Sequence, residues 1–392
     1  MSEWKKVKLG DLTTKITKGT TPSNIGESFC SNGIPFIRSE LITQYKYISY
    51  DGLLYISNET HEKLKRSQLE ANDILFSMAG VYLGKTAILR ECDVPANTNQ
   101  AVALIRLNPM LCNVDYIYYF LNQKSVVSYV NQISGQAAQP NINLQQIGSI
   151  PILIPSREKQ DNIATILSHY DSLIENYQKQ IKLLEEAAQR LYKEWFVDFH
   201  FPGHENTKIV DGVPEGWEKK KVGDITPIKT GKKDANFGTS DGAYPFFTCS
   251  QEPIKAPSYS FDTSAVILAG NGDFNVKLYR GKFEAYQRTY VLEPTNERML
   301  YLLYFCISEN MSRLATGASG STIKFLTKGM IESLDINEPS RRVTDSFNQI
   351  IEPIRTQKEN LQTQIRLLTE ARDRLLPKLM SGEIDINAPK GQ

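Results

Sequence analysis

The chain of 392 residues contains two copies of one unit, and this duplication constrains its fold more than any other feature. Trp4 and the lysine-rich stretch after it recur at Trp217, which lies 213 residues further along. Near the end of each copy, residues 180–184 match residues 364–368 at a distance of only 184. The copies therefore differ by insertions in their first parts and agree best in their last parts.

A heptad pattern of apolar residues closes each copy. Side chains spaced alternately by four and three residues are typical of a helix that packs along a second helix. The first seam is Ile163, Leu167, Tyr170, Ile174, Tyr177, Ile181, Leu184, Ala188, Leu191 and Trp195, and the second is Phe347, Ile351, Ile354, Leu361, Ile365, Leu368, Leu375 and Leu379. Lys358 and Arg372 interrupt only the second seam, so the first helix could also pair with a copy of itself.

One amphipathic helix lying on a core would explain either seam alone. Two seams at matched positions favour instead an antiparallel coiled coil within one chain, with helices of about 40 residues and roughly 60 Å at 1.5 Å per residue. The segments before the helices alternate short β-branched and aromatic runs with Gly, Pro and Asn, which predicts strand-rich mixed domains. Strands are expected at residues 34–37, 73–78, 101–105, 150–154, 265–268 and 289–292, and helices at 114–132 and 298–314.

The predicted fold class is therefore α+β, with two tandem mixed α/β domains separated by two long antiparallel helices in a pseudo-two-fold repeat. The expected boundaries are 1–156 for the first domain, 157–200 for its helix, 201–340 for the second domain, 341–380 for its helix and 381–392 for a tail.

Composition excludes several function classes. The chain is 41% hydrophobic and has no apolar run long enough for a membrane span, so we expect a cytoplasmic protein. Its five cysteines are scattered and its four histidines are too dispersed for a metal site or a catalytic triad. The net charge of +1 does not by itself indicate nucleic-acid binding, so basic residues would have to gather on one face through folding.

Three motifs carry a resemblance to a known family. They are residues 214–217 at the start of the second copy, residues 190–199 at the end of the first helix, and residues 376–384 near the C-terminus. Across its whole length the chain resembles the specificity subunits of type I restriction-modification systems. The resemblance implies two target-recognition domains that bind double-stranded DNA, assembly with two methyltransferase subunits and two motor-nuclease subunits, and no catalysis by this chain.

The motifs of catalysis are missing from the sequence. Residues 80–86 look like a phosphate-binding loop, but only three residues separate Gly80 from Gly84 where the motif needs four. No tetrapeptide that holds a flipped adenine and no S-adenosylmethionine loop is present. We therefore expect no cofactor in this chain, and the resemblance implies S-adenosylmethionine, ATP and Mg²⁺ on the partner subunits.

Candidate DNA-contacting residues fall into three groups, and ordinary solvated loops remain an alternative for each. Lysines and hydroxyls near glycine suit phosphate contacts: Lys15, Lys18, Thr20, Thr21, Lys229, Lys232 and Lys233. The polar loop before the last strand of each copy suits base-edge contacts: Gln136, Gln139, Asn141, Ser319, Thr322 and Lys324. Further polar residues beside predicted strands are Arg38, Lys85, Asn97, Asn99, Gln100, Asn271, Lys277, Arg280, Gln287 and Arg288.

The sequence thus predicts a DNA specificity subunit that reads a bipartite, asymmetric target through its two domains and directs adenine methylation and restriction by its partners. The alternatives are a coiled-coil adaptor that binds only proteins and a nuclease with a degenerate site. The target sequence itself does not follow from the residues, because no residue-to-base code applies to such domains.

Overall fold

A computed structural model describes residues 4–135, 140–318, 320, 324–384 and 386. The chain forms two compact units, unit 1 with residues 1–178 and 362–392 and unit 2 with residues 179–361. Each unit contains one globular domain and part of both long helices, which are α5 (Arg157–Tyr192) and α10 (Arg341–Ser381). The expected class of two mixed domains with two long helices is confirmed, but each compact unit combines helical segments from both copies.

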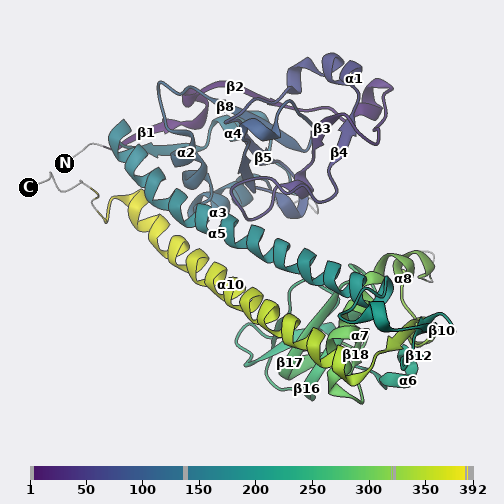
Figure 1. Cartoon of the computed structure of the whole chain (residues 1–392). Helices are drawn as coiled ribbons and strands as arrows, with labels where there is room; N and C mark the ends of the chain where they lie inside the picture. Colours follow the sequence, from purple (N-terminus) through teal and green to yellow (C-terminus); the bar gives the residue numbers. More distant parts are fainter. Residues whose placement is uncertain (1–3, 136–139, 319, 321–323, 385, 387–392) are drawn as a thin grey trace, which may run out of the picture. The chain divides into compact units, whose positions relative to one another are not determined.

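Among its described residues, unit 1 has three small sheets, which lie in the purple to blue part of Figure 1. Their strand orders are β2-β8-β5-β6, β4-β3-β7 and β1-β9. The elements in chain order are β1 (Lys5–Lys8), β2 (Thr13–Lys18), β3 (Ile34–Ile37), β4 (Leu54–Ile56), α1 (Asn58–Lys63), β5 (Ile74–Ser77), β6 (Thr86–Ile88), β7 (Asn97–Thr98), β8 (Val102–Leu107), α2 (Val114–Leu121), α3 (Lys124–Ile133), α4 (Leu144–Gly148) and β9 (Pro151–Ile154). Buried residues of β5, β8 and α2 share one core with Ile163 and Leu167 of α5.

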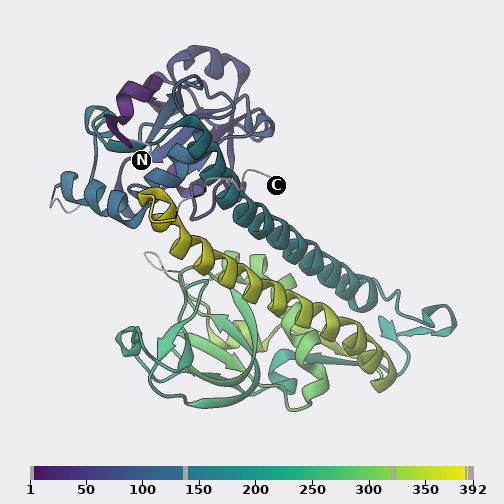
Figure 2. The same cartoon turned by 90° about the vertical axis from the view of Figure 1, so that its left-hand side faces the viewer.

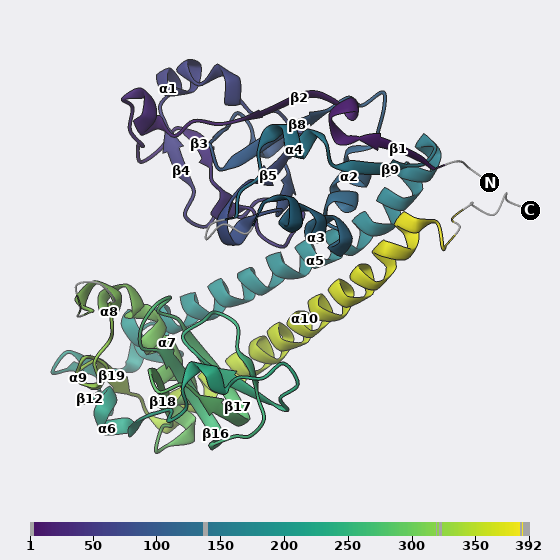
Figure 3. The same cartoon turned by 180° about the vertical axis from the view of Figure 1, so that it is seen from behind.

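Unit 2 has one larger sheet of order β13-β18-β16-β17-β14-β15, with α7 packed beside β16 and β17 (Figure 3). Two-stranded sheets β10-β11 and β12-β19 complete it. The elements are β10 (Ile209–Val210), β11 (Val213–Pro214), β12 (Glu218–Lys221), α6 (Val222–Ile225), β13 (Ile228–Thr230), β14 (Tyr244–Phe247), β15 (Ile254–Ala256), β16 (Phe261–Ala269), β17 (Val276–Ala285), β18 (Thr289–Leu292), α7 (Leu300–Glu309), α8 (Met311–Gly317), α9 (Lys328–Glu332) and β19 (Asp335–Glu338).

The two domains share one strand plan despite their different sheets. Phe36 of β3 pairs in parallel with Asn97 of β7, and Phe246 of β14 pairs in parallel with Glu284 of β17. In unit 2 the long strand β17 pairs with both β16 and β14, whereas in unit 1 the short strands β6 and β7 divide these two pairings. The sheet of the first domain is therefore split where that of the second is continuous.

The helices α5 and α10 pack antiparallel within each unit (Figure 2). In unit 2, Glu185 pairs with Lys358, and Trp195 packs against Phe347 at a ring distance of 5.8 Å. Since the residue number rises on one helix as it falls on the other, the chain directions are opposite. Every residue of both predicted seams is buried or half-buried, as a helix–helix interface requires.

Each copy opens with a tryptophan that packs at the end of a long helix. Trp217 is buried against Phe196 and Phe201, with ring distances of 5.7 and 4.9 Å. In unit 1, Gly382 comes directly after α10 and lies close to the Trp4 indole: an added Cβ on Gly382 would be 3.1 Å from the indole nitrogen. The aromatic residue at the start of each copy therefore closes the core over the end of a helix.

A glycine after the second strand of each copy lets two backbones touch. A Cβ on Gly19 would lie 1.7 Å from the carbonyl oxygen of Thr98, and one on Gly231 would lie 1.9 Å from that of Ala285. Such distances are far inside van der Waals contact, so only glycine fits. These contacts fix the turns that follow β2 and β13.

We predict that Gly231→Ala destabilises unit 2 by about 3 kcal/mol, the upper end of the range for overpacking, because the carbonyl of Ala285 belongs to a sheet and cannot yield. Gly329→Ala is the matched control, since a Cβ there meets nothing within 4 Å in α9 and alanine favours a helix. The measurement is the denaturant midpoint of the full chain. Equal midpoints for the two variants would contradict the close-contact role of Gly231.

Candidate nucleic-acid interface

Four segments of unit 1 meet at one end of its main sheet. They are residues 19–21 after β2, residues 77–85 between β5 and β6, residues 99–101 before β8, and residues 140–142 before α4. Main-chain hydrogen bonds join them: Gly19 N–H to Asn99 C=O at 3.0 Å, Met78 N–H to Ala101 C=O at 2.8 Å and Gly80 N–H to Pro140 C=O at 3.1 Å. We call this set of segments loop cluster 1.

Several predicted DNA-contacting residues come together in loop cluster 1. The Thr21 hydroxyl donates to the Gln100 side-chain oxygen at 2.5 Å, and the Thr21 N–H donates to the same oxygen at 3.2 Å. The Gln100 amide nitrogen therefore remains as a donor on an exposed side chain. Asn141 is also exposed, and its backbone pairs with Ala79. Two amides that can read base edges thus lie on one hydrogen-bonded set of loops.

Lys85 ends the turn that resembled a phosphate loop. Its amine lies 5.0 Å from the centre of the Tyr82 ring, and its carbonyl accepts from Ser77 N–H at 2.8 Å. Gly80 and Gly84 both have positive φ angles, as a tight turn needs. The geometry is that of a rigid surface turn carrying one lysine, which suits a contact to a single phosphate.

Unit 2 repeats this arrangement as loop cluster 2, made of residues 231–233, 270–272, 286–288 and 324–326. Gln287 N–H donates to Lys233 C=O at 2.9 Å, Gly270 N–H to Arg288 C=O at 2.9 Å, and Leu326 N–H to Gly270 C=O at 2.8 Å. Gln287 is the equivalent of Gln100. Gln100 comes two residues after Thr98, which contacts Gly19, and Gln287 comes two residues after Ala285, which contacts Gly231. The exposed candidates here are Lys232, Gln287, Arg288 and Lys324, while Lys233 and Asn271 are half-buried.

Three predicted cations of unit 2 have partners within the protein. Lys229 pairs with Glu293 at 2.9 Å, and Arg280 pairs with Glu352 of α10 at 3.0 Å. The Lys277 amine donates to Ser250 C=O at 2.9 Å and to the Asn275 side chain, and burial lowers its pKa. These contacts argue for structural roles, because a DNA contact would first have to break them.

Asn97 lies in the core rather than in the loop cluster. It is fully buried, and its amide donates to Leu64 C=O at 3.2 Å and to the Ser67 hydroxyl at 3.3 Å. Arg38 is half-buried and pairs with Glu40 at 3.5 Å. These partners argue for structural roles for both residues, and the sequence pattern did not reveal them.

The remaining candidates lie beside or within loop cluster 1, or outside the residues that the structure describes. Lys18 is exposed, Lys15, Thr20 and Asn99 are half-buried, and the Thr20 hydroxyl accepts from Arg66 at 3.2 Å. Gln136, Gln139, Ser319 and Thr322 lie outside the described residues.

Three further exposed residues in or beside these loops did not stand out in the sequence. Val81 is 88% exposed at the tip of the Lys85 turn, and Phe325 is 39% exposed beside Lys324. Exposed apolar side chains in such loops can contact a thymine methyl group. Arg66, exposed beside Thr20, is the third. A sequence pattern does not distinguish Val81 and Phe325 from core residues, because only the fold places them outside.

A hydrogen-bonded tyrosine and carboxylate attach each domain to a long helix. In unit 1, the Tyr119 hydroxyl donates to Asp171 of α5 at 2.5 Å, and Arg372 of α10 pairs with the other oxygen of Asp171 at 2.6 Å. In unit 2, Tyr301 and Arg355 bind Glu352. Burial acts to raise the pKa of Glu352, but these hydrogen bonds outweigh it and lower the pKa to about 2. The loop clusters are therefore carried on domains that polar contacts attach firmly to the helices.

The described part of the chain contains no candidate metal centre and one notable cavity. Within residues 4–135, 140–318, 320, 324–384 and 386, no three His, Cys, Asp or Glu side chains are grouped to hold a metal ion. A cavity of about 230 Å³ in unit 2 is lined by Tyr192, Phe196 and Cys306 among others, and burial raises the pKa of the Cys306 thiol to about 12. None of the described helices combines the length and apolarity needed to cross a bilayer.

Comparison with known proteins gives a consistent result. Residues 1–186 and 214–365 match the type I restriction modification DNA specificity domain. The chain is 27% identical to the type I restriction enzyme MjaIX specificity subunit of Methanocaldococcus jannaschii, over 98% of this chain and 94% of that protein. It is 36% identical to the EcoDI specificity subunit of Escherichia coli, over 44% of this chain and 39% of that protein.

A solved structure shares the fold. The S subunit of a type I restriction-modification system from M. genitalium superimposes with a TM-score of 0.56, at 16% sequence identity, over 96% of each chain. The family model matches both copies of the repeat, and within each matched copy lies one loop cluster. The chain therefore belongs to the family of type I restriction-modification DNA specificity domain proteins.

Proposed function

We propose that this chain is the DNA specificity subunit of a type I restriction-modification complex and has no catalytic activity of its own. The observation that carries the proposal is the family match over both copies, each of which presents a loop cluster with exposed amide side chains and at least one lysine. Relatives named as specificity subunits support this function over that of an adaptor that binds only proteins.

In the proposed mechanism each loop cluster contacts one half of a divided DNA target. Gln100 and Asn141 in the first domain, and Gln287 in the second, would pair with base edges, while lysines such as Lys85 and Lys232 would contact phosphates. The clusters carry different side chains, so the two half-sites would differ in sequence. Because the helices are antiparallel, the half-sites would have inverted orientation.

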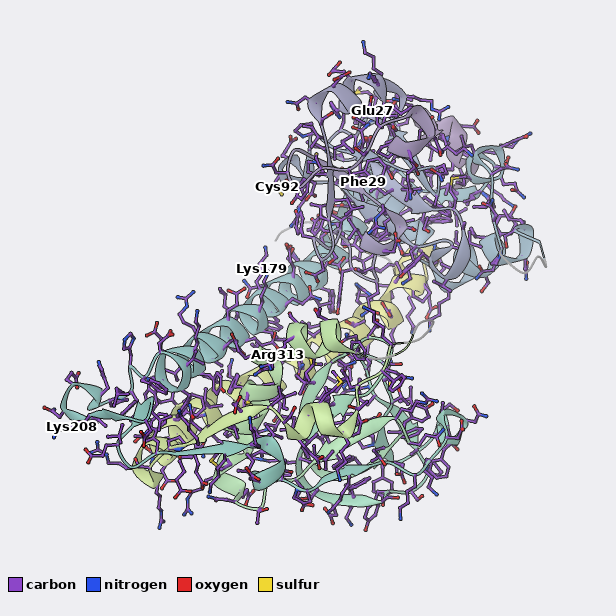
Figure 4. The ribbon with its side chains drawn as sticks, turned by 90° about the vertical axis from the view of Figure 1, so that its right-hand side faces the viewer. Glu27, Phe29, Cys92, Lys179, Lys208 and Arg313 are labelled. Carbon is purple, nitrogen blue, oxygen red and sulfur yellow. The ribbon has the colours of Figure 1, made fainter. Side chains whose placement is uncertain are left out.

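Matched exposed residues on the long helices support binding of two copies of one partner. Along each helix they are spaced by four and three residues, which places them on one face. They are Asn176, Gln180, Leu183, Ala187 and Arg190 on α5, and the identical Asn360, Gln364, Leu367, Ala371 and Arg374 on α10, all exposed. Lys179 marks this exposed part of α5 in Figure 4.

We call each of these two sets of exposed residues a stripe, and we infer that each stripe binds one methyltransferase subunit. Leu183 and Leu367 are 63% and 52% exposed, so the same apolar side chain faces solvent at equivalent places on the two helices. The partners would supply S-adenosylmethionine and the methyl transfer, and two further motor-nuclease subunits would supply ATP, Mg²⁺ and DNA cleavage. The complex would act on DNA in the cytoplasm.

The central experiment is to purify the chain alone and together with the methyltransferase encoded beside it, and to map methylated adenines on genomic DNA. We expect methylation of one bipartite, asymmetric sequence only when both proteins are present. Methyl transfer by the chain alone would contradict the non-catalytic role. A complex that methylates without sequence preference would favour the adaptor function.

We predict that Gln100→Ala and Asn141→Ala each weaken binding to the specific target by about 1–3 kcal/mol and leave non-specific binding unchanged. Lys85→Ala should weaken both kinds of binding and lower the salt slope by about one. Thr21→Val is the control for Gln100, because it removes the hydroxyl that donates to the Gln100 side-chain oxygen but keeps the Gln100 side chain. Fluorescence anisotropy at several salt concentrations measures all four; equal losses on both DNAs for all variants would exclude base reading.

We predict that Leu183→Glu and Leu367→Glu each remove one methyltransferase subunit from the complex, and that the double variant removes both, because a buried carboxylate at the contact would be unpaired. Leu173→Glu is the control: Leu173 is 45% exposed on α5, but its counterpart is Gln357. Native mass spectrometry gives the stoichiometry, and two bound subunits in the double variant would contradict the role of the stripes.

A further inference from the structure

Among the described contacts, an ion pair between the long helices occurs in each unit, and these pairs have the same polarity. Asp171 of α5 binds Arg372 of α10 at 2.6 Å in unit 1, and Glu185 of α5 binds Lys358 of α10 at 2.6 Å in unit 2. The carboxylate is on α5 and the cation on α10 in each case. Asp171 is 6% exposed and Arg372 is 13% exposed, so the first pair is deeply buried.

The repeat does not reproduce these charges. At the distance of 184 residues that relates the helices, Arg372 corresponds to Ala188 and Lys358 corresponds to Ile174. In the opposite direction, Asp171 corresponds to Arg355 and Glu185 corresponds to Thr369. The two seams therefore share their apolar residues but differ in the charges that lie between them.

This difference would penalise pairing of α5 with the α5 of a second copy of the chain. In the observed register, residue 171 lies opposite residue 372 and residue 185 opposite residue 358. Asp171 would then face Ala188 of the second copy, and Glu185 would face Ile174. For Asp171, a buried carboxylate without its cation is strongly unfavourable. Glu185 is 50% exposed, so the loss of its partner costs less.

Pairing of α10 with the α10 of a second copy would be penalised differently. Arg372 would face Arg355 of the second copy, which brings two guanidinium groups of like charge together in a partly buried seam. Lys358 would face Thr369, which offers no charge. Arg372 also pairs with Asp373 of its own helix, but only the pairing of α5 with α10 gives all four groups an oppositely charged partner on the facing helix.

We propose that the Asp171–Arg372 and Glu185–Lys358 ion pairs select pairing of α5 with α10 against self-pairing of either helix between two copies of the chain. The selection goes beyond the proposed DNA function, because it concerns which helices associate and would hold for any partner or target. Its effect is to keep the two dissimilar domains on one helix pair. The apolar seam alone allowed self-pairing of the first helix, and the charges reverse that expectation.

Arg372→Glu in the full chain tests the proposal. The substitution places two carboxylates opposite each other in the α5–α10 pair, and it places a carboxylate opposite Arg355 in an α10–α10 pair. We expect the wild-type chain to be monomeric and the variant to form at least ten times more dimer at the same concentration, measured by light scattering and by co-purification of two differently tagged copies. Arg366→Glu on the exposed side of α10 is the matched control and should remain monomeric.

Adding Asp171→Arg to Arg372→Glu restores an ion pair of reversed sign within the chain and should return it to a monomer. If Arg372→Glu alone does not fold, Lys358→Glu at the more exposed pair provides the second test, with Glu185→Lys as its rescue. A folded Arg372→Glu or Lys358→Glu chain that stays as monomeric as Arg366→Glu overturns the proposal. Failure of both rescues also overturns it.

Discussion

The apolar seam between α5 and α10 is the interaction on which the rest of the molecule depends. In unit 1 the core of the first domain contains Ile163 and Leu167 of α5 together with Leu376 and Leu379 of α10. In unit 2 the second core contains Trp195 and Phe347 in the same way. Each domain thus completes its core with the helix of the other copy, so neither repeat alone contains all of the residues that bury its apolar surface.

Much of this architecture could be predicted from local patterns. The heptad spacing predicted both long helices, and β-branched runs predicted β3, β5, β9 and β18 to within a residue or so. The predicted helix at 114–132 is instead two helices, α2 and α3, because Asn122 ends the first with its backbone in a turn conformation. The contrast between a split sheet in unit 1 and a continuous one in unit 2 depends on pairing between distant strands, which no local pattern contains.

The candidate interface was predicted only in part for the same reason. Residue type brought Thr21, Gln100 and Asn141 to attention, and the fold places them in one cluster, while their contact with DNA stays a prediction. Residue type could not separate Arg280, which binds Glu352 on α10, from cations that face solvent. The distinction depends on partners distant in sequence, as it does for the fully buried Asn97.

The loop clusters are joined almost entirely through main-chain groups. Gly19, Met78 and Gly80 in unit 1, and Gly270 in unit 2, make contacts that use peptide N–H and C=O rather than side chains. Peptide groups are common to all residues except proline, which lacks the N–H. Exposed residues between these contacts can therefore be exchanged without altering the frame that holds them. Over evolutionary time such a protein could acquire a new target by surface substitutions alone, with its folding and its assembly preserved.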